Sequence, residues 1–428
     1  MNTIYKGMLC LALAGAAMAP VRAQRVYTLE ECRDMALQHN VKVRNAANSV
    51  AGAEEEKKEA FTKYFPEVSA TGIGYAADKG LLQMDMGPDM EMSLLKNGVM
   101  GGVALTQPVY AGGQIVNANR LAAVGVEASK VQKEQSENEV RLTVEQYYWQ
   151  VVTLQEKLTT LLAVERQLDS LCKDVGASVD AGVTTRNDLL QVQLKRNDTE
   201  SSRIDLENNL SVSLMVLAQY IGAEPDMVVV EGRIPTDGVP PFPQDLHCDH
   251  ADALPRTTDF RLLESDVKAN RLQHKLAVGK NLPSVAVGAG YMCDNLMDKS
   301  HPFAIGFVSV SVPLSGWWGG SHAIKKQKLQ VKNAENRLAD SSERLVIAMQ
   351  KAWTDLQNAY KQILIARKSI EQSAENLRLN EDYYHAGTTT MSDLLDAQTM
   401  FRQSRDNYVE AYAQFRIKTV EYLQATGR

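Results

Sequence analysis

The residue types that most often carry out chemistry gather at one point of the sequence, in the segment HCDH at 247–250. His247, Cys248 and His250 are all types that bind zinc. A structural zinc site needs four ligands, and no second ligand pair follows at a suitable spacing. We therefore expect these three residues to be polar groups on the surface, and we expect neither a metal site nor a cofactor site.

Motifs of catalysis and nucleotide binding are missing from the rest of the chain. The Gly-x-Gly pairs at 72–74 and 288–290 lack the third glycine and the following helix of a dinucleotide site. The sequence contains no Walker A loop, no G-x-S-x-G and no H-E-x-x-H. With 52 acidic and 46 basic residues, its net charge of −6 argues against nucleic acid as a partner. We expect a protein that is not an enzyme.

The strongest pattern is an internal duplication. AGVTTRNDLL at 181–190 recurs as AGTTTMSDLL at 386–395, an offset of 205 residues with seven of ten positions identical. PEVSATGIGY (66–75) recurs loosely as PSVAVGAGY (283–291), and Pro108 and Pro313 are again 205 apart. The chain is thus predicted to consist of two copies of one structural unit.

We divide the chain accordingly. A signal peptide is expected at 1–23 and the first repeat at 24–222, with a strand pair at about 66–109 and a tip turn at about 181–187. A linker is expected at 223–256, where 227–230 would be a short strand or a turn; it is predicted by Pro225, Pro235, Pro240, Pro241 and Pro243. The second repeat is expected at 257–428, with a strand pair at about 283–313 and a tip turn at about 386–392. Each copy would run helix, strand, strand, long helix, turn, helix.

The long helices carry a coiled-coil period. Between about 321 and 384, apolar residues recur every seven positions except for one step of four, a stutter that locally unwinds a supercoil. Such a helix would be about 95 Å long. A wide tube of helices needs elements of this length, whereas a globular domain does not. The residues of the repeat are Ile324, Val331, Leu338, Leu345, Ala352, Leu356, Ile363, Ile370, Leu377 and Tyr384.

The four expected strands are about ten residues long, which suits a tilted strand that crosses a bilayer. Tyr110, Trp317 and Trp318 follow the returning strands, where an interfacial belt of aromatic residues would lie. Four strands cannot close a barrel, so the chain must oligomerise if they span a membrane. The alternative is a pair of soluble hairpins with incidental tryptophans.

The N-terminus indicates export. Lys6 precedes a short apolar stretch, and Val21-Arg22-Ala23 offers a cleavage site before Gln24. Removal of Lys6 and Arg22 would change the net charge from −6 to −8. Four widely spaced cysteines would remain, without a C-x-x-C pair, and we expect free buried thiols at Cys32, Cys172, Cys248 and Cys293.

Together these features resemble the TolC-like outer-membrane efflux factors. The segments that carry the resemblance are YTLEECRDMALQHNVKVRNA (27–46), YAGGQ (110–114) and the helix-turn-helix at 384–427. It implies a mainly α fold with a β-barrel segment: a homotrimer whose four strands per protomer form one twelve-stranded barrel in the outer membrane, continued by a helical tunnel in the periplasm. It also implies a channel for efflux or type I secretion, with a periplasmic adaptor and an RND- or ABC-type inner-membrane pump as partners.

The resemblance assigns roles at the two tip turns. Asp393 and Asp396 match aspartates that line the narrowest ring of the tunnel, Asp188 matches the acidic residue of the first turn, and Tyr384 matches a tyrosine beside the gate. A basic residue often stands where this chain has Thr389, and Arg186 could supply that cation. The expected surface for adaptor docking is Gly182, Thr184, Gly387, Thr388, Leu394 and Leu395.

Two alternatives remain open. Glycine after a helix, threonine before the next and aspartate in its first turn are also ordinary helix caps, and capping alone would explain each turn singly. A soluble periplasmic coiled-coil adaptor or scaffold would share the export signal and the long helices. The paired strands of bilayer length favour the channel.

Overall fold

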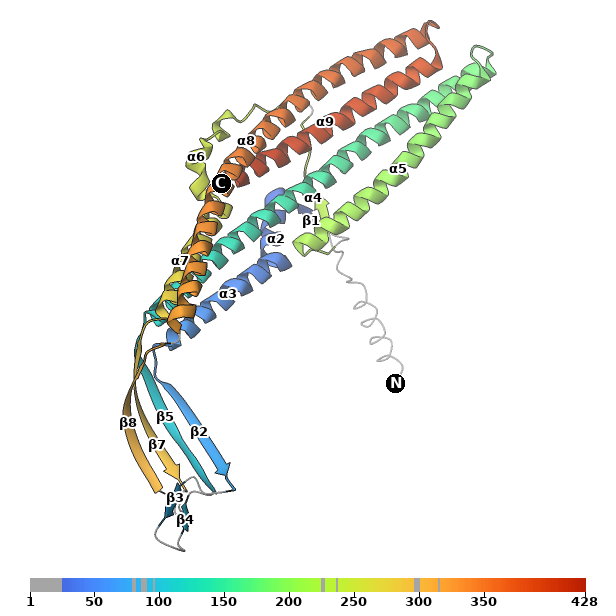
Figure 1. The fold of residues 1–428 in the computed structure, drawn as a ribbon. Coiled ribbons are helices and arrows are strands. Elements are labelled where there is room, and N and C mark those ends of the chain that lie inside the picture. The colour runs from blue at the N-terminus through green and yellow to red at the C-terminus, as the bar shows by residue number, and fades with distance from the viewer. Residues whose placement is uncertain are drawn as a thin grey trace, which may run out of the picture. The chain divides into compact units, whose positions relative to one another are not determined.

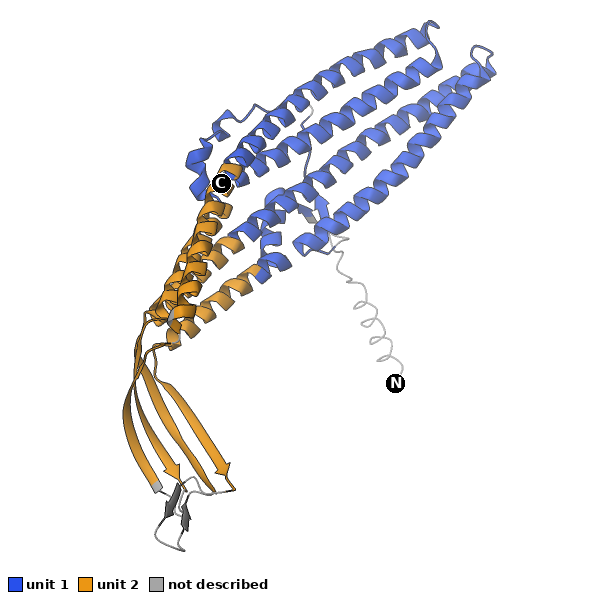
Figure 2. Ribbon diagram, viewed as in Figure 1, with its two compact units in different colours: residues 1–45, 134–257, 345–428 blue, residues 46–133, 258–344 orange. Residues whose placement is uncertain are grey.

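The computed structural model describes residues 25–78, 82–85, 91–94, 97–224, 228–235, 238–295, 301–314 and 316–428. The expected signal peptide at 1–23 lies outside the described residues, and so does part of the linker, 225–227 and 236–237. Helices dominate the described chain (Figure 1). The chain divides into two compact units (Figure 2). Unit 1 comprises residues up to Asn45, Glu134–Thr257 and Leu345–Arg428, and unit 2 comprises Ala46–Lys133 and Thr258–Arg344.

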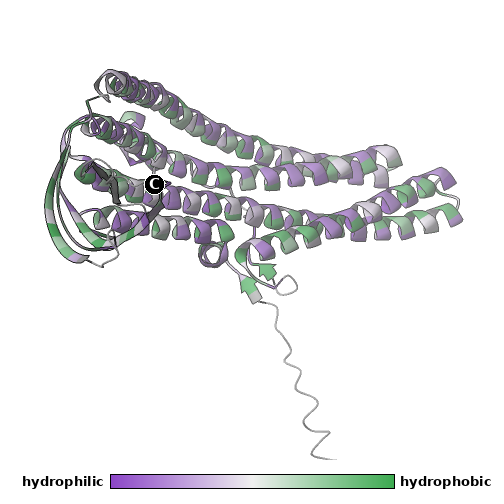
Figure 3. Ribbon diagram, turned by 60° about the horizontal axis from the view of Figure 1, so that its bottom comes forward, coloured by the Kyte–Doolittle hydropathy of each residue, from purple (hydrophilic) through white to green (hydrophobic). Residues whose placement is uncertain are grey.

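Four long helices form two hairpins. Helix α4 (Gln114–Asp180, 67 residues) is followed by α5 (Arg186–Ile221), and α8 (Gly316–His385, 70 residues) is followed by α9 (Met391–Ala425). At 1.5 Å per residue, α4 and α8 are each about 100 Å long. Among the described helices, none combines the length and the apolar character needed to cross a membrane. Hydrophobic and hydrophilic residues alternate along these helices, as expected for coiled-coil packing (Figure 3).

The predicted heptad seam of α8 is best covered beyond the stutter, from Leu356 onwards. Leu356, Ile363 and Leu377 are at most 7% exposed, while Ile370 and Tyr384 are half-buried. The seam residues of unit 2, among them Ile324 and Val331, are only half-buried in one chain. The stutter predicted from the sequence therefore separates a well-covered half of the seam from a partly open half.

Shorter elements complete the two repeats. The first helix of the chain is divided into α2 (Leu29–His39) and α3 (Val41–Thr62), because Asn40 has an extended backbone with ψ of 130°. Its counterpart in the second repeat is α7 (Thr258–Gly279). The linker contains β6 (Val228–Val230), which pairs in parallel with β1 (Arg25–Tyr27), and three short helical turns. These turns are η2 (Gln244–Leu246), α6 (His250–Ala253) and η3 (Leu254–Arg256).

Unit 2 contains a four-stranded antiparallel sheet in the order β2-β5-β7-β8. Its strands are β2 (Glu67–Ala76), β5 (Asn97–Ala111), β7 (Ser284–Asp294) and β8 (His301–Ser311), so one strand pair from each repeat builds the sheet. Both expected strand pairs are present. Two further strands, β3 (Leu82–Asp85) and β4 (Glu91–Leu94), form a separate hairpin that the sequence analysis did not anticipate.

The register of the sheet separates its residues into two faces. Directly opposite residues of an antiparallel pair share a face, so Val68, Leu105, Ala289 and Gly306 lie on one side. Apart from Gln107 and the terminal Asn97, this side carries apolar residues and glycine. We call it the apolar face: its large side chains are Val68, Val99, Val103, Leu105, Tyr110, Val285, Val287, Tyr291, Val308 and Val310.

The other face is mixed. It carries small and polar residues, among them Ser69, Thr106 and Ser309, and large apolar residues, among them Ile73, Phe303 and Phe307. The ring of Phe307 fills the space where a side chain at Gly288 would lie. One face of the sheet is thus uniformly apolar yet exposed, and the first and last strands, β2 and β8, each have an unpaired edge in one chain.

Two sequence expectations need correction. All four cysteines are free, but only Cys32 is buried, whereas Cys293 is exposed on β7. Burial raises the pKa of the Cys32 thiol to about 12. In the HCDH segment His247 is exposed, as expected, and Cys248 is half-buried, but His250 is buried and its Nε2 lies 3.3 Å from the hydroxyl of Tyr422. This hydroxyl also accepts a hydrogen bond from the backbone N–H of Cys248. The segment anchors the linker to α9.

Candidate functional site

The two tip turns, residues 181–185 and 386–390, are structural copies of each other. Gly182 and Gly387 both have φ of +71°, a left-handed conformation that glycine adopts at little cost. In the first turn Val183 N–H donates to Ser178 O (2.8 Å) and Gly182 N–H donates to Val179 O (3.0 Å). This pair of bonds is a Schellman motif, which satisfies the last carbonyls of a helix. The second turn repeats it around Gly387.

Each turn then starts the next helix with a capping box. Thr185 accepts from the N–H of Asp188 (3.3 Å), and Asp188 Oδ2 accepts from the Thr185 N–H (3.2 Å). Thr390 and Asp393 repeat this exchange at 3.2 Å in each direction. Helices α5 and α9 therefore begin at residues 186 and 391, a little earlier than the expected turns at 181–187 and 386–392 would place them.

The aspartates of the caps are held in their charged form. Hydrogen bonds from Thr184 and Thr185 lower the pKa of Asp188. Hydrogen bonds from the Thr390 hydroxyl and backbone, and from Thr389, lower the pKa of Asp393. Capping is thus an observed role of both aspartates. Asp396 lies one turn further on and is exposed, so it takes no part in the cap.

Tyr384 connects the two hairpins. Its hydroxyl, on α8, lies close to the side chain of Thr184 in the first turn. The Thr184 hydroxyl donates to Asp188 Oδ2 (2.6 Å). Partial burial, and to a lesser degree the charge of Asp188, raises the pKa of Tyr384. The structure therefore brings Tyr384 close to the hydrogen-bonded pair Thr184 and Asp188, although they come from opposite repeats.

A hydrophobic cluster, which we call the tip cluster, lies behind this contact. It joins α4, α5, α8 and α9 through Val164, Leu168, Val175, Val192, Leu377, Met391, Leu394, Leu395 and Ala397. Leu394 is 3% exposed and Leu395 is 8% exposed. Their side chains are occupied by the packing of their own chain, so we remove both leucines from the docking surface expected from sequence.

The remaining tip residues face solvent in one chain. Gly182, Gly387 and Thr388 are exposed, and a side chain placed on either glycine would meet no atom within 4 Å. Arg186 is also exposed, and among the described residues it forms no ion pair with Asp393 or Asp396. The structure of one chain does not bring the cation suggested by the resemblance to the second turn.

Aromatic residues gather where the sheet meets the helices. Tyr110 lies on the apolar face and is 48% exposed, and Trp318 in the first turn of α8 is 75% exposed. Trp317 belongs to α8, but its side chain lies outside what the structure describes. The structure adds a cluster that the sequence analysis missed: Phe61 packs against Tyr64 and Phe65, with ring centroids 5.5 and 5.6 Å apart. The pattern F-x-x-Y-F directly before Pro66 could have revealed it.

Comparisons with known proteins agree with this architecture. A family model described as "Outer membrane efflux protein" matches residues 32–223 and 251–428, which correspond to the two repeats. "Protein CyaE" of Bordetella pertussis is 22% identical over 430 residues, which cover 99% of this chain and 89% of the relative.

Solved structures share the fold. The outer membrane protein VceC from Vibrio cholerae superposes with a TM-score of 0.75 at 14% identity, over 93% of this chain and 96% of VceC. The CmeC outer membrane channel of Campylobacter jejuni gives a TM-score of 0.75 at 15% identity, over 93% of this chain and 85% of CmeC.

Proposed function

Because the chain belongs to the outer membrane efflux protein family, we propose that its two tip turns form the gate and the docking end of an outer-membrane channel. The protein is the outer-membrane component of a tripartite efflux or secretion system, and its helical portion lies in the periplasm. Its fold is that of the TolC-like channels, mainly helical with a strand segment and an internal repeat. The soluble scaffold is not favoured, because the family match covers both repeats.

The observation that carries the channel is the exposed apolar face of the sheet. Antiparallel strands with one continuous apolar face that can contact lipid are typical of membrane-spanning barrels. Four strands with free edges at β2 and β8 cannot close, since about eight are needed. We propose a homotrimer, in which three sheets would provide twelve strands and β2 of one protomer would pair with β8 of the next.

The docking end is assigned to Gly182, Thr184, Gly387 and Thr388. The absence of a side chain on the two glycines leaves open space around both turns, which supports close approach of a helix from a periplasmic adaptor. An RND- or ABC-type pump of the inner membrane would supply the energy. Replacement of Gly182 and Gly387 by leucine should abolish export and adaptor co-purification while trimers still form. Normal export by that variant would contradict the docking assignment.

The gate is assigned to Tyr384, Asp188, Asp393, Asp396 and Arg186. In a trimer, Asp393 and Asp396 would each occur three times around one axis. Like charges about 6 Å apart repel by about 0.7 kcal/mol per pair at a water-like dielectric, and by more in a narrow pore. Such rings concentrate cations and repel anions.

The test must separate the pore charge from the capping role seen at Asp393. Asparagine retains an oxygen that can accept the Thr390 bonds, so Asp393→Asn with Asp396→Asn removes charge with little loss of capping. We expect weaker cation selectivity, measured as the reversal potential of single channels in a salt gradient. The matched control is Asp198→Asn with Asp205→Asn, two exposed aspartates within α5. A reversal potential equal to that of the control would refute the aspartate gate.

A further inference from the structure

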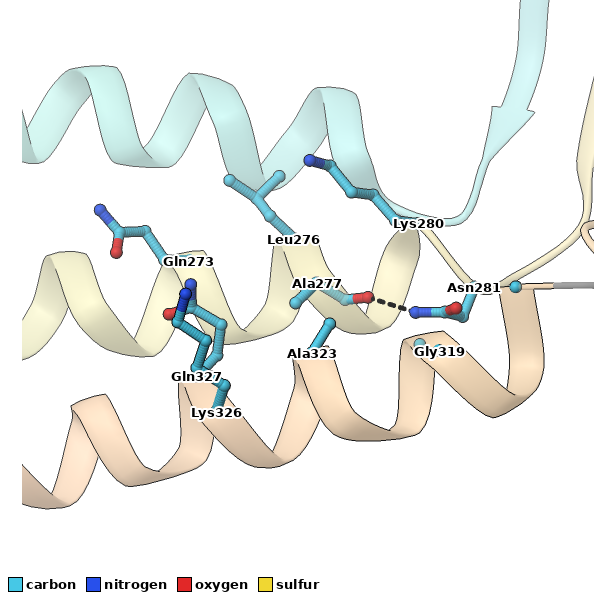
Figure 4. A pocket seen from close by; sticks show the side chains of 11 residues that line it. Gln273, Leu276, Ala277, Lys280, Asn281, Gly319, Ala323, Lys326 and Gln327 are labelled. Carbon is cyan, nitrogen blue, oxygen red and sulfur yellow. Dashed lines mark hydrogen bonds between the residues drawn. The ribbon is translucent and has the colours of Figure 1, made fainter.

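The helices of unit 2 lie in the same order as the strands of the sheet. Side chains of α4 donate hydrogen bonds to Ala60 O of α3 (2.8 Å) and to Gly279 O of α7 (3.4 Å). Figure 4 shows α7 between α4 and α8, and Arg271 of α7 pairs with Glu335 of α8 (2.7 Å). Small residues of α8, among them Ala323, line the groove between these two helices. The order is therefore α3-α4-α7-α8, and in the described part of unit 2 α3 and α8 end the row as β2 and β8 end the sheet.

The two repeats agree in the register of their strands as well as in sequence. Ser284 of β7 lies opposite Ser311 of β8, and Glu67 of β2 lies opposite Thr106 of β5. Between the repeats the first residue of each pair is shifted by 217 positions and the second by 205, and α7 and α3 also end 217 positions apart. Helix α7 is therefore the equivalent of α3, and α8 is the equivalent of α4.

Equivalent helices differ in how well they are covered. Val131 of α4 is 4% exposed, whereas Asn336, its equivalent on α8, is exposed. Leu276 of α7 is half-buried, whereas Glu59, its equivalent on α3, is exposed. Helices α4 and α7 cover each other at the junction between the repeats. The sides of α8 and α3 that correspond to this junction are left open in one chain.

The open side of α8 is basic. At about 100° per residue, Lys325 and Lys332 lie on the side of the helix opposite Ala323, with Leu329 between them. All three of these residues are exposed. Residues 316–334 contain four lysines and no aspartate or glutamate, and in the described part of the chain none of these lysines lies within ion-pair distance of a carboxylate.

The open side of α3 is acidic. In unit 2 the half-buried residues of α3, which form the stripe towards α4, are Ala46, Val50, Ala53 and Ala60. Glu55 and Glu59 lie on the other side of the helix and are exposed. Glu55 pairs with Lys58 of its own helix (2.7 Å), while Glu59 forms no ion pair in the described part of the chain. Gly52 is also exposed, and a side chain placed there would meet no atom within 4 Å.

The junction between the repeats predicts the contacts between two protomers. Gln114 of α4 lies beside Gly279 of α7, and because α4 follows β5 and α7 precedes β7, the two helices run in opposite directions. Shifted by 205 and 217 positions, this contact becomes Gly319 of α8 beside Thr62 in α3 of the next protomer. Each further residue along α8 is then level with one residue further back along α3.

The same shift gives the register between β8 and β2 of the next protomer. Leu105 lies opposite Ala289 at the junction between the repeats, so Val310 would lie opposite Gly72. Both Val310 and Gly72 belong to the apolar face, which this register continues from one protomer to the next. A slip of one residue would place Val310 opposite a residue of the other face.

We propose that the seam between protomers copies the junction between repeats, so that the basic side of α8 docks on the acidic side of α3 of a second copy of the chain. Six residues beyond the contact at Gly319, Lys325 would lie between Glu55 and Glu59. Four residues further on, Leu329 would pack against Gly52. The inference rests on the proposed homotrimer and assigns the residues that join its protomers. Because the two sides differ, the contact is head-to-tail, and opposite charges fix its register and partner.

Disulfide formation in the purified trimer tests the register of the strands. Directly opposite residues of antiparallel strands have Cα atoms about 4.5–5.5 Å apart, which suits a disulfide. Val310→Cys with Gly72→Cys should therefore link protomers covalently, seen as dimers and trimers on a denaturing gel without reductant. The matched control is Val310→Cys with Ile73→Cys, which places the second cysteine on the other face. The native cysteines are present in both variants, so equal cross-linking would overturn the predicted seam.

Charge reversal tests the contact between the helices, with the exchange of subunits between tagged and untagged trimers in detergent as the measurement. Loss of an exposed ion pair weakens a contact by about three-fold, so Lys325→Glu, which acts at three seams, should speed exchange by about thirty-fold at low salt. Lys325→Glu combined with Glu59→Lys should restore most of the native rate. The matched control is Lys326→Glu, because this exposed neighbour lines the groove towards α7 and should leave exchange unchanged.

The outcomes separate this inference from the proposed trimer. Equal exchange rates for Lys325→Glu and Lys326→Glu, or no recovery in the double variant, would overturn the docking of α8 on α3. A native protein that is trimeric by light scattering would then still support the homotrimer. A monomeric native protein would overturn both the homotrimer and the seam.

Discussion

The contact between Tyr384 and Thr184 makes the sharpest prediction about gating. Within one chain, Tyr384 of the hairpin α8–α9 lies close to Thr184 of the hairpin α4–α5 at the tip, where a small movement would let the two hydroxyls form a hydrogen bond. Tyr384→Phe removes the hydroxyl but retains the ring that packs against the tip cluster. If the contact holds the tip closed, its loss should make opening more frequent without loosening the helices.

The expected change in the ratio of open to closed channels follows from the free energy of one Tyr384–Thr184 hydrogen bond and from the three copies of it in a trimer. A neutral hydrogen bond contributes about 1 kcal/mol net. In a trimer that opens in a concerted way, three such bonds are lost together, which amounts to about 3 kcal/mol or roughly a hundred-fold in the ratio of open to closed channels. Thr184→Val removes the observed bond to Asp188 as well as the hydroxyl that Tyr384 would contact, so it should exceed this effect.

Single-channel recording in planar bilayers measures the frequency of opening directly. Tyr383→Phe is the matched control, because this neighbouring tyrosine on α8 is 51% exposed and lies outside the tip cluster. We expect frequent openings for Tyr384→Phe and native behaviour for Tyr383→Phe, with the same melting curve for both. Equal opening frequencies in the two variants would refute the role of the contact.

Other predictions concern stability and are measured by thermal or denaturant unfolding. The carboxylate of Glu145 is buried and accepts hydrogen bonds from Arg33 and from Trp149 Nε1 (2.9 Å). Glu145→Ala should lower the free energy of unfolding by about 3 kcal/mol. Glu145→Gln should lower it less, because Arg33 is partly exposed and the glutamine can still accept from Trp149. Gly387→Ala should lower the free energy of unfolding by about 1–2 kcal/mol, because residue 387 has a positive φ. Gly176→Ala should raise it by about 0.5–1 kcal/mol, because Gly176 lies within α4 and an added side chain would meet no atom within 4 Å. The pKa values of Asp188 and Asp393 are lowered in the folded protein, so both carboxylates stabilise the fold at pH values above the ordinary pKa of 3.8. This stabilisation is lost as the pH falls through the folded pKa values. Asp188→Asn and Asp393→Asn should each lack this loss. Burial lowers the pKa of His250 below 6.5; the charges of His247 and Arg428 act in the same direction and that of Asp249 opposes them. The native protein should therefore lose stability as the pH falls below about 6.5, because the unfolded chain binds the proton more readily. His250→Gln should flatten that pH dependence.

Much of the fold could be predicted from local patterns. The duplication placed both tip turns, since Gly182 and Gly387 must occupy a left-handed backbone position and Thr-x-x-Asp specifies a capping box. The seven-residue period predicted α8 within a few residues of its observed ends. These features depend on neighbours in the sequence, and so the sequence displays them directly.

The composition of the candidate site was less predictable. The sequence analysis placed Leu394 and Leu395 on the docking surface of the tip, but four helices meet there and bury both. His250 lies in a segment rich in prolines that looks like a surface linker, yet Tyr422 of α9 covers it. In each case the outcome depends on which distant element packs against the residue.

The sequence by itself determined the two repeats, the long helices, the caps of the tip and the two strand pairs of the four-stranded sheet. Only the tertiary structure decided which residues of the sheet share the apolar face, because that depends on the register between β5 and β7, strands of different repeats. It also brought Tyr384 to Thr184, two residues separated by 200 positions. Helix periods and caps arise from interactions within a few residues, whereas register and packing between repeats arise from contacts whose partners the chain order does not specify.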